Sequence, residues 1–285
     1  MTASDGMLRT SRVERIRQWG LQLSRLAPFL RAPGKLLYQR FLSGFARRLR
    51  EAGSSPGAWL KAYFAEHAPV TFVQVGAFDG VANDPIHELI VNRPRWRGLL
   101  IEPIPRAFER LKENYAAYQH KLQFLNVAIS DRTCDLSMYE VDAKGLALPN
   151  WAPQIASLNR SHITKHFADV DVRELTVPAI RLGEALASAG LDAVDLLVMD
   201  VEGHERQILE DFDFDAFRVR VVLFERAHLE KDDESDITQT LEAHGFRCLS
   251  FADDTIAYRP MREASLRFKT RRNGTAARST GVARK

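Results

Sequence analysis

The residues best suited to chemistry lie in one stretch, Asp195–Glu205, which reads Asp-Leu-Leu-Val-Met-Asp-Val-Glu-Gly-His-Glu. Its apolar run ends on Asp200, and Glu202 and His204 follow at once. An acid that ends an apolar strand must find a partner or solvent, so Asp200 is the candidate polar anchor for a substrate. His204 is a candidate base, because an imidazole within hydrogen-bonding reach can take a proton from a hydroxyl. Glu205 is expected to favour the dipole of a following helix.

Two more candidates for the same place come later in the chain. Glu225 closes the next apolar run, and His228 lies three residues beyond it. The carboxyl ends of parallel strands meet at one edge of a sheet, so we expect Glu202 and Glu225 to contact the substrate and His228 to be the alternative base. Asp200, Glu225 and His228 could instead hold a divalent cation that acidifies a hydroxyl. Their spacing is not a metal motif, so the sequence assigns no metal site.

An earlier apolar run is followed by a glycine turn, Val75-Gly76-Ala77-Phe78-Asp79-Gly80. Glycines allow a backbone to approach a ligand closely, although this turn is not the Gly-x-Gly-x-x-Gly of dinucleotide-binding proteins. Glu102 ends the next apolar run, 22 residues beyond Gly80, where an acid can accept hydrogen bonds from both hydroxyls of a ribose. Together they predict a cofactor that contains a nucleoside. The expected contacts are Gly76, Ala77, Gly80, Glu102 and Pro103.

The elements that must position these residues alternate between strands and helices. Strands are predicted at 70–75, 98–101, 122–129, 196–199, 219–224, 247–251 and 255–258, with a hairpin strand at 136–141. Helices are predicted at 58–65, 86–91, 108–118, 182–189, 205–212 and 237–244. This alternation is typical of an α/β fold with a mostly parallel sheet. Residues 143–171 have no clean period and are expected to form a functional loop, in which Ser157 and His162 face the substrate.

Three segments are expected along the chain. Residues 1–52 form a basic helical N-terminal extension, because apolar residues recur every three or four positions on either side of breaks at Pro28 and Pro33. Residues 58–260 form the α/β domain. Residues 261–285 form a basic tail that is expected to be disordered, since it is poor in large apolar side chains.

The charge of the chain is unevenly distributed. Residues 1–50 carry 11 Lys and Arg against two acids, and residues 261–285 carry eight against one. The remaining residues, 51–260, hold 21 Lys and Arg against 34 Asp and Glu, a net charge of −13. Phosphate binding needs basic grooves, so this acidic domain argues against a nucleic-acid partner. The basic ends could dock on an anionic membrane or on a partner protein.

Three features predict a cytoplasmic protein. The chain has no apolar run of 18 residues, and Arg25 interrupts the most apolar part of its N-terminal region. Cys134 and Cys248 show neither metal nor redox spacing, which is typical of a reducing compartment. The basic ends would then face the inner surface of the membrane.

Taken in order, the motif segments make the chain resemble the FkbM family of S-adenosyl-L-methionine-dependent methyltransferases. The resemblance covers about Thr71–Tyr258 and rests on the glycine turn with Asn83-Asp84-Pro85, on Trp96–Pro103, and on the Asp-x-Glu-Gly-x-Glu core at 200–205. It implies a doubly wound, mostly parallel seven-stranded sheet. It also implies O-methylation of a hydroxyl on a sugar, a glycan or a polyketide-like small molecule.

The resemblance also implies roles for single residues. Many members carry an acid at the position of Gln74, where it helps to hold the amino group of the methionine. Here the amide oxygen of Gln74 could accept that hydrogen bond, or Asp79 could substitute for the acid. Ala128 and Ile129 lie at the end of the third strand, where residues of this fold flank the adenine.

Two alternatives remain open. One is a methyltransferase-like module that binds a partner through its basic ends and performs no turnover. The other is a nicotinamide-dependent oxidoreductase on a similar sheet, against which stands the missing Gly-x-Gly-x-x-Gly motif.

Overall fold

The computed structural model describes residues 55–141, 156–157 and 172–260 of the 285-residue chain. The predicted N-terminal extension, the C-terminal tail and most of the predicted loop, including His162, lie outside the described residues. Within the described ranges, no helix is both long enough and apolar enough to cross a membrane.

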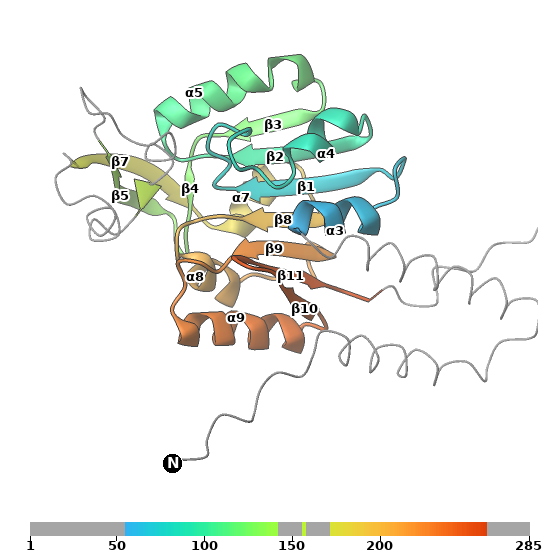
Figure 1. Cartoon of the computed structure of the whole chain (residues 1–285). Coiled ribbons are helices and arrows are strands. Elements are labelled where there is room, and N and C mark those ends of the chain that lie inside the picture. The colour runs from blue at the N-terminus through green and yellow to red at the C-terminus, as the bar shows by residue number, and fades with distance from the viewer. Residues whose placement is uncertain (1–54, 142–155, 158–171, 261–285) are drawn as a thin grey trace, which may run out of the picture.

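A seven-stranded sheet forms the centre of the domain (Figure 1). Its strands are β1 (Val70–Val75), β2 (Trp96–Ile101), β3 (Leu122–Leu125), β8 (Leu196–Met199), β9 (Val221–Glu225), β10 (Arg247–Ser250) and β11 (Asp254–Tyr258). They lie in the order β10-β11-β9-β8-β1-β2-β3. The five strands from β9 to β3 pair in parallel, and β11 is antiparallel to both of its neighbours. The predicted seven-stranded, mostly parallel sheet is confirmed.

Helices cover both faces of this sheet, which makes the fold doubly wound. The described helices are α3 (Pro56–Tyr63), α4 (His87–Asn92), α5 (Pro105–Asn114), α7 (Leu182–Ser188), α8 (Glu205–Glu210), α9 (Lys231–Ala243) and the 3₁₀ turn η2 (Ala116–Tyr118). Successive side chains of a strand point to opposite faces, so Val73 of β1 enters one core and Phe72 enters the other. The first core lies under α7, α8 and α9, and the second under α3, α4 and α5.

The prediction of a single strand over 122–129 is wrong. The chain leaves the main sheet after Leu125, and β4 (Ala128–Ile129) joins a second sheet. Asn126 lies at the break, and its amide Nδ2 donates hydrogen bonds to the carbonyl oxygens of Glu102 (2.7 Å) and Pro103 (3.1 Å). These bonds hold the chain to the end of β2 and direct it away from the sheet edge.

The second sheet has the order β4-β7-β5-β6, with β5 (Cys134–Val141), β6 (Ala156–Ser157) and β7 (Val172–Ile180). The hairpin strand predicted at 136–141 is present in β5 and pairs with β7. Strand β7 was not predicted from the sequence, because Pro178 and the charged residues Arg173 and Glu174 weaken its strand signal.

Helix α9 begins six residues earlier than predicted. Its first turn contains Asp232, Asp233 and Glu234. These acids hide the apolar period that begins at Ile237, yet they favour a helix N-terminus because they oppose its positive dipole end.

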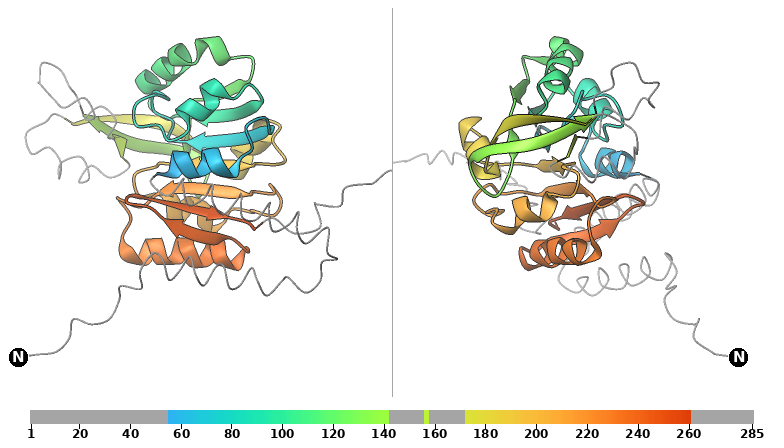
Figure 2. Two further views of the ribbon diagram at one scale, coloured as in Figure 1. Left: turned by 45° about the vertical axis from the view of Figure 1, so that its right-hand side comes forward. Right: turned by 90° about the vertical axis from the view of Figure 1, so that its left-hand side faces the viewer.

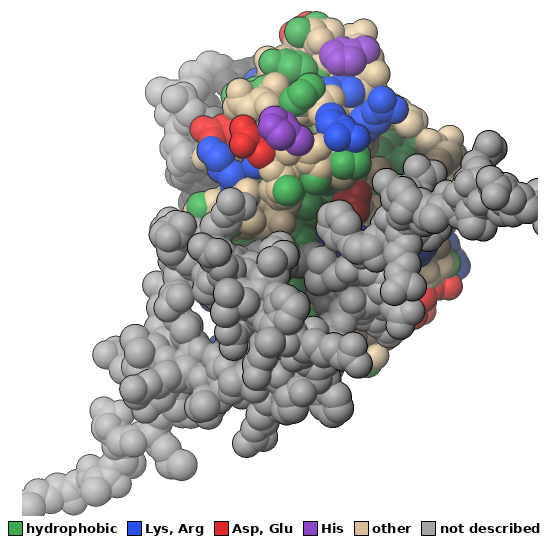
Figure 3. Space-filling model, turned by 90° about the vertical axis from the view of Figure 1, so that its right-hand side faces the viewer, with side chains coloured by type: hydrophobic (Ala, Val, Ile, Leu, Met, Phe, Trp, Pro, Cys, Tyr) green, Lys and Arg blue, Asp and Glu red, His purple; other side chains and the backbone are tan. Residues whose placement is uncertain are grey.

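The carboxyl ends of β1, β2, β8 and β9 meet at one edge, the side on which the second sheet lies (Figure 1). The right panel of Figure 2 looks onto this edge, with β5 and β7 in front. Figure 3 looks onto the opposite edge, where the visible described surface carries Lys, Arg and His side chains together with Asp and Glu side chains. The predicted site residues that the structure describes therefore lie at the edge opposite to the one that Figure 3 shows.

Candidate active site

A cavity of about 560 Å³ opens at the carboxyl ends of β1, β2, β8 and β9. Seven acidic residues contribute to its wall: Asp84, Glu102, Asp200, Glu202, Glu225, Asp253 and Asp254. His204 and His228 also line it, and its described lining contains no Lys or Arg. The cavity therefore favours a ligand that carries positive charge.

Gly76 permits the close approach of two strand ends beneath the cavity. Its φ is +77°, and a Cβ atom at this position would lie 1.8 Å from the carbonyl oxygen of Asp200. The backbone N–H of Asp200 donates to the carbonyl of Val75 over 3.0 Å, which holds β8 against β1. Only glycine meets both requirements, and its missing side chain leaves the cavity floor open.

Glu102 joins the end of β2 to the glycine turn. Its carboxylate accepts the N–H of Phe78 on Oε2 (2.8 Å) and the N–H of Ile104 on Oε1 (2.8 Å). Burial raises the pKa of Glu102 to about 7, despite these two hydrogen bonds, which favour the charged form. Each carboxylate oxygen can accept a further hydrogen bond, so Glu102 can accept hydrogen bonds from the two hydroxyls of a ribose.

Gln74 and Asp84 form a second polar position in the cavity wall. Gln74 is buried in β1, and its Oε1 atom has no hydrogen-bond partner among the described residues. Asp84 Oδ1 accepts the N–H groups of Ile86 (2.7 Å) and His87 (3.0 Å). Burial raises the pKa of Asp84 to about 6, while a hydrogen bond with Gln74 acts in the opposite direction. A ligand amino group would satisfy the buried acceptor at Gln74.

Asp84 was not predicted as a site residue, although Asn83-Asp84-Pro85 was part of the family resemblance. Asp79, which was predicted instead, does not line the cavity. Its Oδ1 atom accepts the N–H groups of Val81 (3.0 Å) and Ala82 (2.9 Å) and so holds the loop.

Gly80, another predicted cofactor contact, also lies outside the cavity lining. Its φ is +72°, and a Cβ atom would lie 2.3 Å from the Tyr115 ring. The Tyr115 hydroxyl donates to the Gly80 carbonyl over 2.7 Å. Gly80 therefore packs the glycine turn against α5 and the segment that follows it.

Asp200, Glu202, Glu225 and His228 gather at the acidic end of the cavity. The Nε2 atom of His228 lies 3.3 Å from Glu202 Oε2 and 3.9 Å from Glu225 Oε2. Burial raises the pKa of Glu202 to about 8 and that of Glu225 to about 7. Asp200 lines the cavity, and solvent in the cavity reaches its side chain. The protein atoms packed around its carboxyl raise its pKa well above the usual value, and the charge of Glu225 raises it further.

The turn between β8 and α8 positions His204 and Glu205. The Nε2 atom of His204 is buried without a hydrogen-bond partner among the described residues, and burial lowers the pKa of this imidazole. Glu205 is the first residue of α8, and its Oε1 accepts the N–H of Val201 over 3.0 Å. Glu205 therefore braces the turn, as the sequence predicted for a carboxylate at a helix start.

Apolar residues line the remaining wall of the cavity. They include Pro103, Ile104, Val127, Ala128, Ile129 and Met138. Pro103, Ala128 and Ile129 were predicted here, and Met138 of β5 was not. Ser157 lies in β6, where its backbone pairs with Tyr139 of β5.

A family model and a related protein of known name both match this chain. The model of the FkbM methyltransferase domain matches residues 74–248. The 2-O-methyltransferase NoeI of Sinorhizobium fredii is 25% identical over 184 residues, which are 62% of this chain and 74% of that protein.

Among solved structures, a methyltransferase FkbM from Methylobacillus flagellatus matches with 13% identity and a TM-score of 0.41, over 66% of this chain and 43% of that longer chain. A SAM-dependent methyltransferase from Aquifex aeolicus matches with 12% identity and a TM-score of 0.38, over 74% and 91% of the two chains. Because the family model spans more than half of the sequence, this chain belongs to the FkbM methyltransferase family.

Proposed function

We propose that this protein transfers a methyl group from S-adenosylmethionine to a hydroxyl oxygen of a neutral sugar, glycan or polyketide-like small molecule. The observation that carries the proposal is the placement of Glu102 and the acidic end in one cavity of an FkbM-family chain. The name of the S. fredii relative, a 2-O-methyltransferase, supports oxygen as the acceptor atom. Family membership favours this function over the nicotinamide oxidoreductase considered from the sequence.

The cavity wall offers groups that fit each part of this cofactor. Glu102 would accept hydrogen bonds from the two ribose hydroxyls. The Oε1 atom of Gln74, with the carboxylate of Asp84 beside it, would receive the amino group of the methionine. Ala128, Ile129 and Met138 would enclose the adenine.

When bound, S-adenosylmethionine supplies a methyl group on a sulfonium, whose C–S bond breaks toward sulfur as the acceptor oxygen bonds to the carbon. The protein must hold the acceptor oxygen in line with that bond and receive its proton. Asp200 is the proposed anchor for the acceptor, because it directly follows β8 and lines the cavity. His204 is the proposed base, since its Nε2 atom has no other partner among the described residues. His228 is the alternative base.

The charge of the cavity restricts the acceptor. A phosphate or sulfate group would meet seven acidic residues and no Lys or Arg in the described lining. Neutral hydroxyl compounds avoid this repulsion, so phosphorylated sugars and nucleic acids are disfavoured.

Methyl transfer can be measured with S-adenosylmethionine labelled on the methyl group. The wild type should label a pool of neutral mono- and oligosaccharides more than the matching phosphorylated pool. His204→Gln should lower turnover at least tenfold with S-adenosylhomocysteine affinity unchanged, whereas His120→Ala, an exposed histidine outside the cavity, should not. Cofactor binding without turnover on any pool would instead favour the binding module.

A further inference from the structure

Three side chains at the acidic end are spaced like ligands of one ion. One ligand atom each from Glu202, Glu225 and His228 lies within 4.8 Å of the other two. The His228 Nε2 atom is 3.3 Å from Glu202 Oε2 and 3.9 Å from Glu225 Oε2. Ligand atoms that lie about 2.0–2.2 Å from one metal ion lie roughly 3 to 4.3 Å from one another. The three side chains would therefore need to move only slightly closer together to bind one ion.

We propose that Glu202, Glu225 and His228 bind a divalent first-row transition-metal cation of the Mn²⁺ type. Two carboxylates suit Mn²⁺, and an imidazole favours a transition metal over Mg²⁺ or Ca²⁺. The three protein ligands leave coordination positions on the cavity side for water or a substrate oxygen.

The backbone presents these ligands from the end of β9, which holds Glu225, and from the loops that follow β8 and β9. Strands β8 and β9 are parallel neighbours, so the loops that carry Glu202 and His228 leave the sheet side by side. A Cβ atom on Gly203 would lie 3.2 Å from the carbonyl oxygen of His228. The site is therefore part of the packed fold, because the two loops touch through the backbone.

A second observation, independent of the three ligands, points to a ligand here. Glu205 is 1% exposed, and its Oε2 atom has no partner within normal hydrogen-bond geometry among the described residues. Glu205 begins α8 three residues after Glu202, and its charge acts on both Glu202 and Glu225. A buried carboxylate oxygen without a partner is costly, and a metal-bound water would supply the missing donor.

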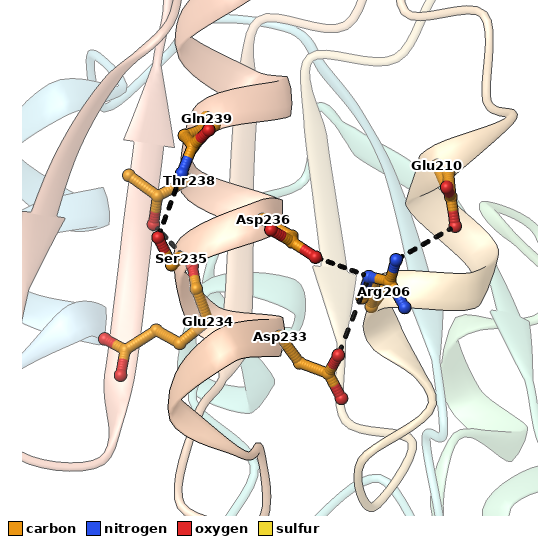
Figure 4. Close-up of polar contacts among 8 residues, drawn as sticks. All are labelled: Arg206, Glu210, Asp233, Glu234, Ser235, Asp236, Thr238 and Gln239. Atoms are coloured by element: carbon orange, nitrogen blue, oxygen red, sulfur yellow. Dashed lines mark hydrogen bonds and ion pairs between the residues drawn. The ribbon is translucent and has the colours of Figure 1, made fainter.

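A second acidic group of the fold provides a contrast. On the outer surface, Arg206 lies 3.0 Å from Asp236, 3.6 Å from Asp233 and 3.8 Å from Glu210, between α8 and α9 (Figure 4). There a guanidinium already balances the carboxylates. The described lining of the cavity contains no Lys or Arg beside its carboxylates, which leaves room for a metal cation in that position.

This site would also deepen the proposed function, and that consequence rests on it. A hydroxyl oxygen that coordinates a divalent cation loses its proton more readily and becomes a better acceptor for the methyl group. Metal binding itself does not depend on methyl transfer and can be tested alone.

The test uses the full-length chain, stripped with a chelator and titrated with Mn²⁺, with free Mn²⁺ followed by electron paramagnetic resonance. The wild type should bind one Mn²⁺ in the cavity, and pulsed spectra should show coupling to an imidazole nitrogen. Glu202→Gln and His228→Asn should weaken binding at least tenfold, and His228→Asn should abolish the nitrogen coupling. Asp236→Asn, in the Arg206 group, should bind Mn²⁺ as the wild type does.

Absence of Mn²⁺ binding by the wild type would overturn the proposal, as would equal losses in Asp236→Asn and His228→Asn. Thermal unfolding of the metal-free variants shows whether each is folded. If Glu202→Gln does not fold, the nitrogen coupling of the wild type decides the question. S-adenosylhomocysteine binding, measured on the same metal-free samples, tests the proposed function separately.

Discussion

At the residue scale, Glu102 links the fold to its chemistry. Its carboxylate accepts the N–H of Phe78 in the glycine turn and the N–H of Ile104 after β2, and it still lines the cavity. Its position at a strand end was predictable from the sequence, as was that of Asp200. The buried acceptor at Gln74 and its contact with Asp84 could not be predicted. They depend on the loop after the glycine turn, which returns to the cavity, and no local sequence pattern predicts the course of that loop.

The buried Glu102 should make stability depend on pH. Its pKa rises from 4.5 to about 7 on folding. As pH increases, the unfolded chain therefore loses the Glu102 proton at a lower pH than the folded chain does. The stability that protonated Glu102 provides is complete below about pH 4.5 and is lost as pH rises through about 7. Wild type should therefore lose about 2–3 kcal/mol relative to Glu102→Gln between pH 5 and pH 8 in urea unfolding. A difference that is constant with pH would contradict this assignment.

Gly76→Ala should be far more damaging than a comparable change elsewhere. Its Cβ atom would overlap the Asp200 carbonyl oxygen at 1.8 Å, and φ would remain at +77°. Gly190 is a matched control, since its φ is +68° and a Cβ atom there would meet nothing within 4 Å. In denaturant unfolding, Gly190→Ala should cost about 1–2 kcal/mol and Gly76→Ala more than about 3 kcal/mol. Equal costs would show that β8 does not approach Gly76 this closely.

At the scale of elements, the strands of the main sheet were predictable because each is a short apolar run between turns. The second sheet was not. Asn126 diverts the chain after β3, and β7 reads as polar because one of its faces is exposed. The consequence is functional, since β5 brings Met138 into the apolar wall of the cavity.

Met138 tests whether the second sheet contributes to cofactor binding. Met138→Ala should weaken S-adenosylhomocysteine binding about three- to tenfold, because it removes an apolar contact of roughly 1 kcal/mol from the cavity wall. Leu136 lies two residues earlier on the same strand. It packs against the small apolar cluster that contains Met138, Val177 and Ala179, and it does not line the cavity. Calorimetry on Leu136→Ala should give wild-type affinity, and equal losses in both variants would indicate a general effect of the second sheet on the fold.

At the scale of the whole molecule, charge divides the chain. Residues 51–260 carry a net charge of −13 between two basic ends, and the cavity contains acids without Lys or Arg in its described lining. Composition alone predicted this division, but it did not show that the acids of distant segments converge on one cavity. That convergence depends on the parallel strand order, which places four strand ends at the same edge.

The basic ends should bind anionic surfaces. Full-length protein should co-sediment with vesicles that contain phosphatidylserine, and 0.5 M salt should release it because the attraction is screened. A shortened chain of residues 51–260 should remain in the supernatant. Equal sedimentation of the two chains would rule out docking through the ends.

The most direct test of the cofactor site is calorimetric titration of the full-length protein with S-adenosylhomocysteine at pH 8, where Glu102 is ionised. The wild type should bind one equivalent, and Glu102→Ala should lose at least tenfold in affinity, since charge-assisted hydrogen bonds to two hydroxyls are removed. Glu109→Ala, an exposed acid of α5 outside the cavity, should bind as the wild type does. No binding by the wild type, or full affinity in Glu102→Ala, would contradict the assignment of this cavity to S-adenosylmethionine.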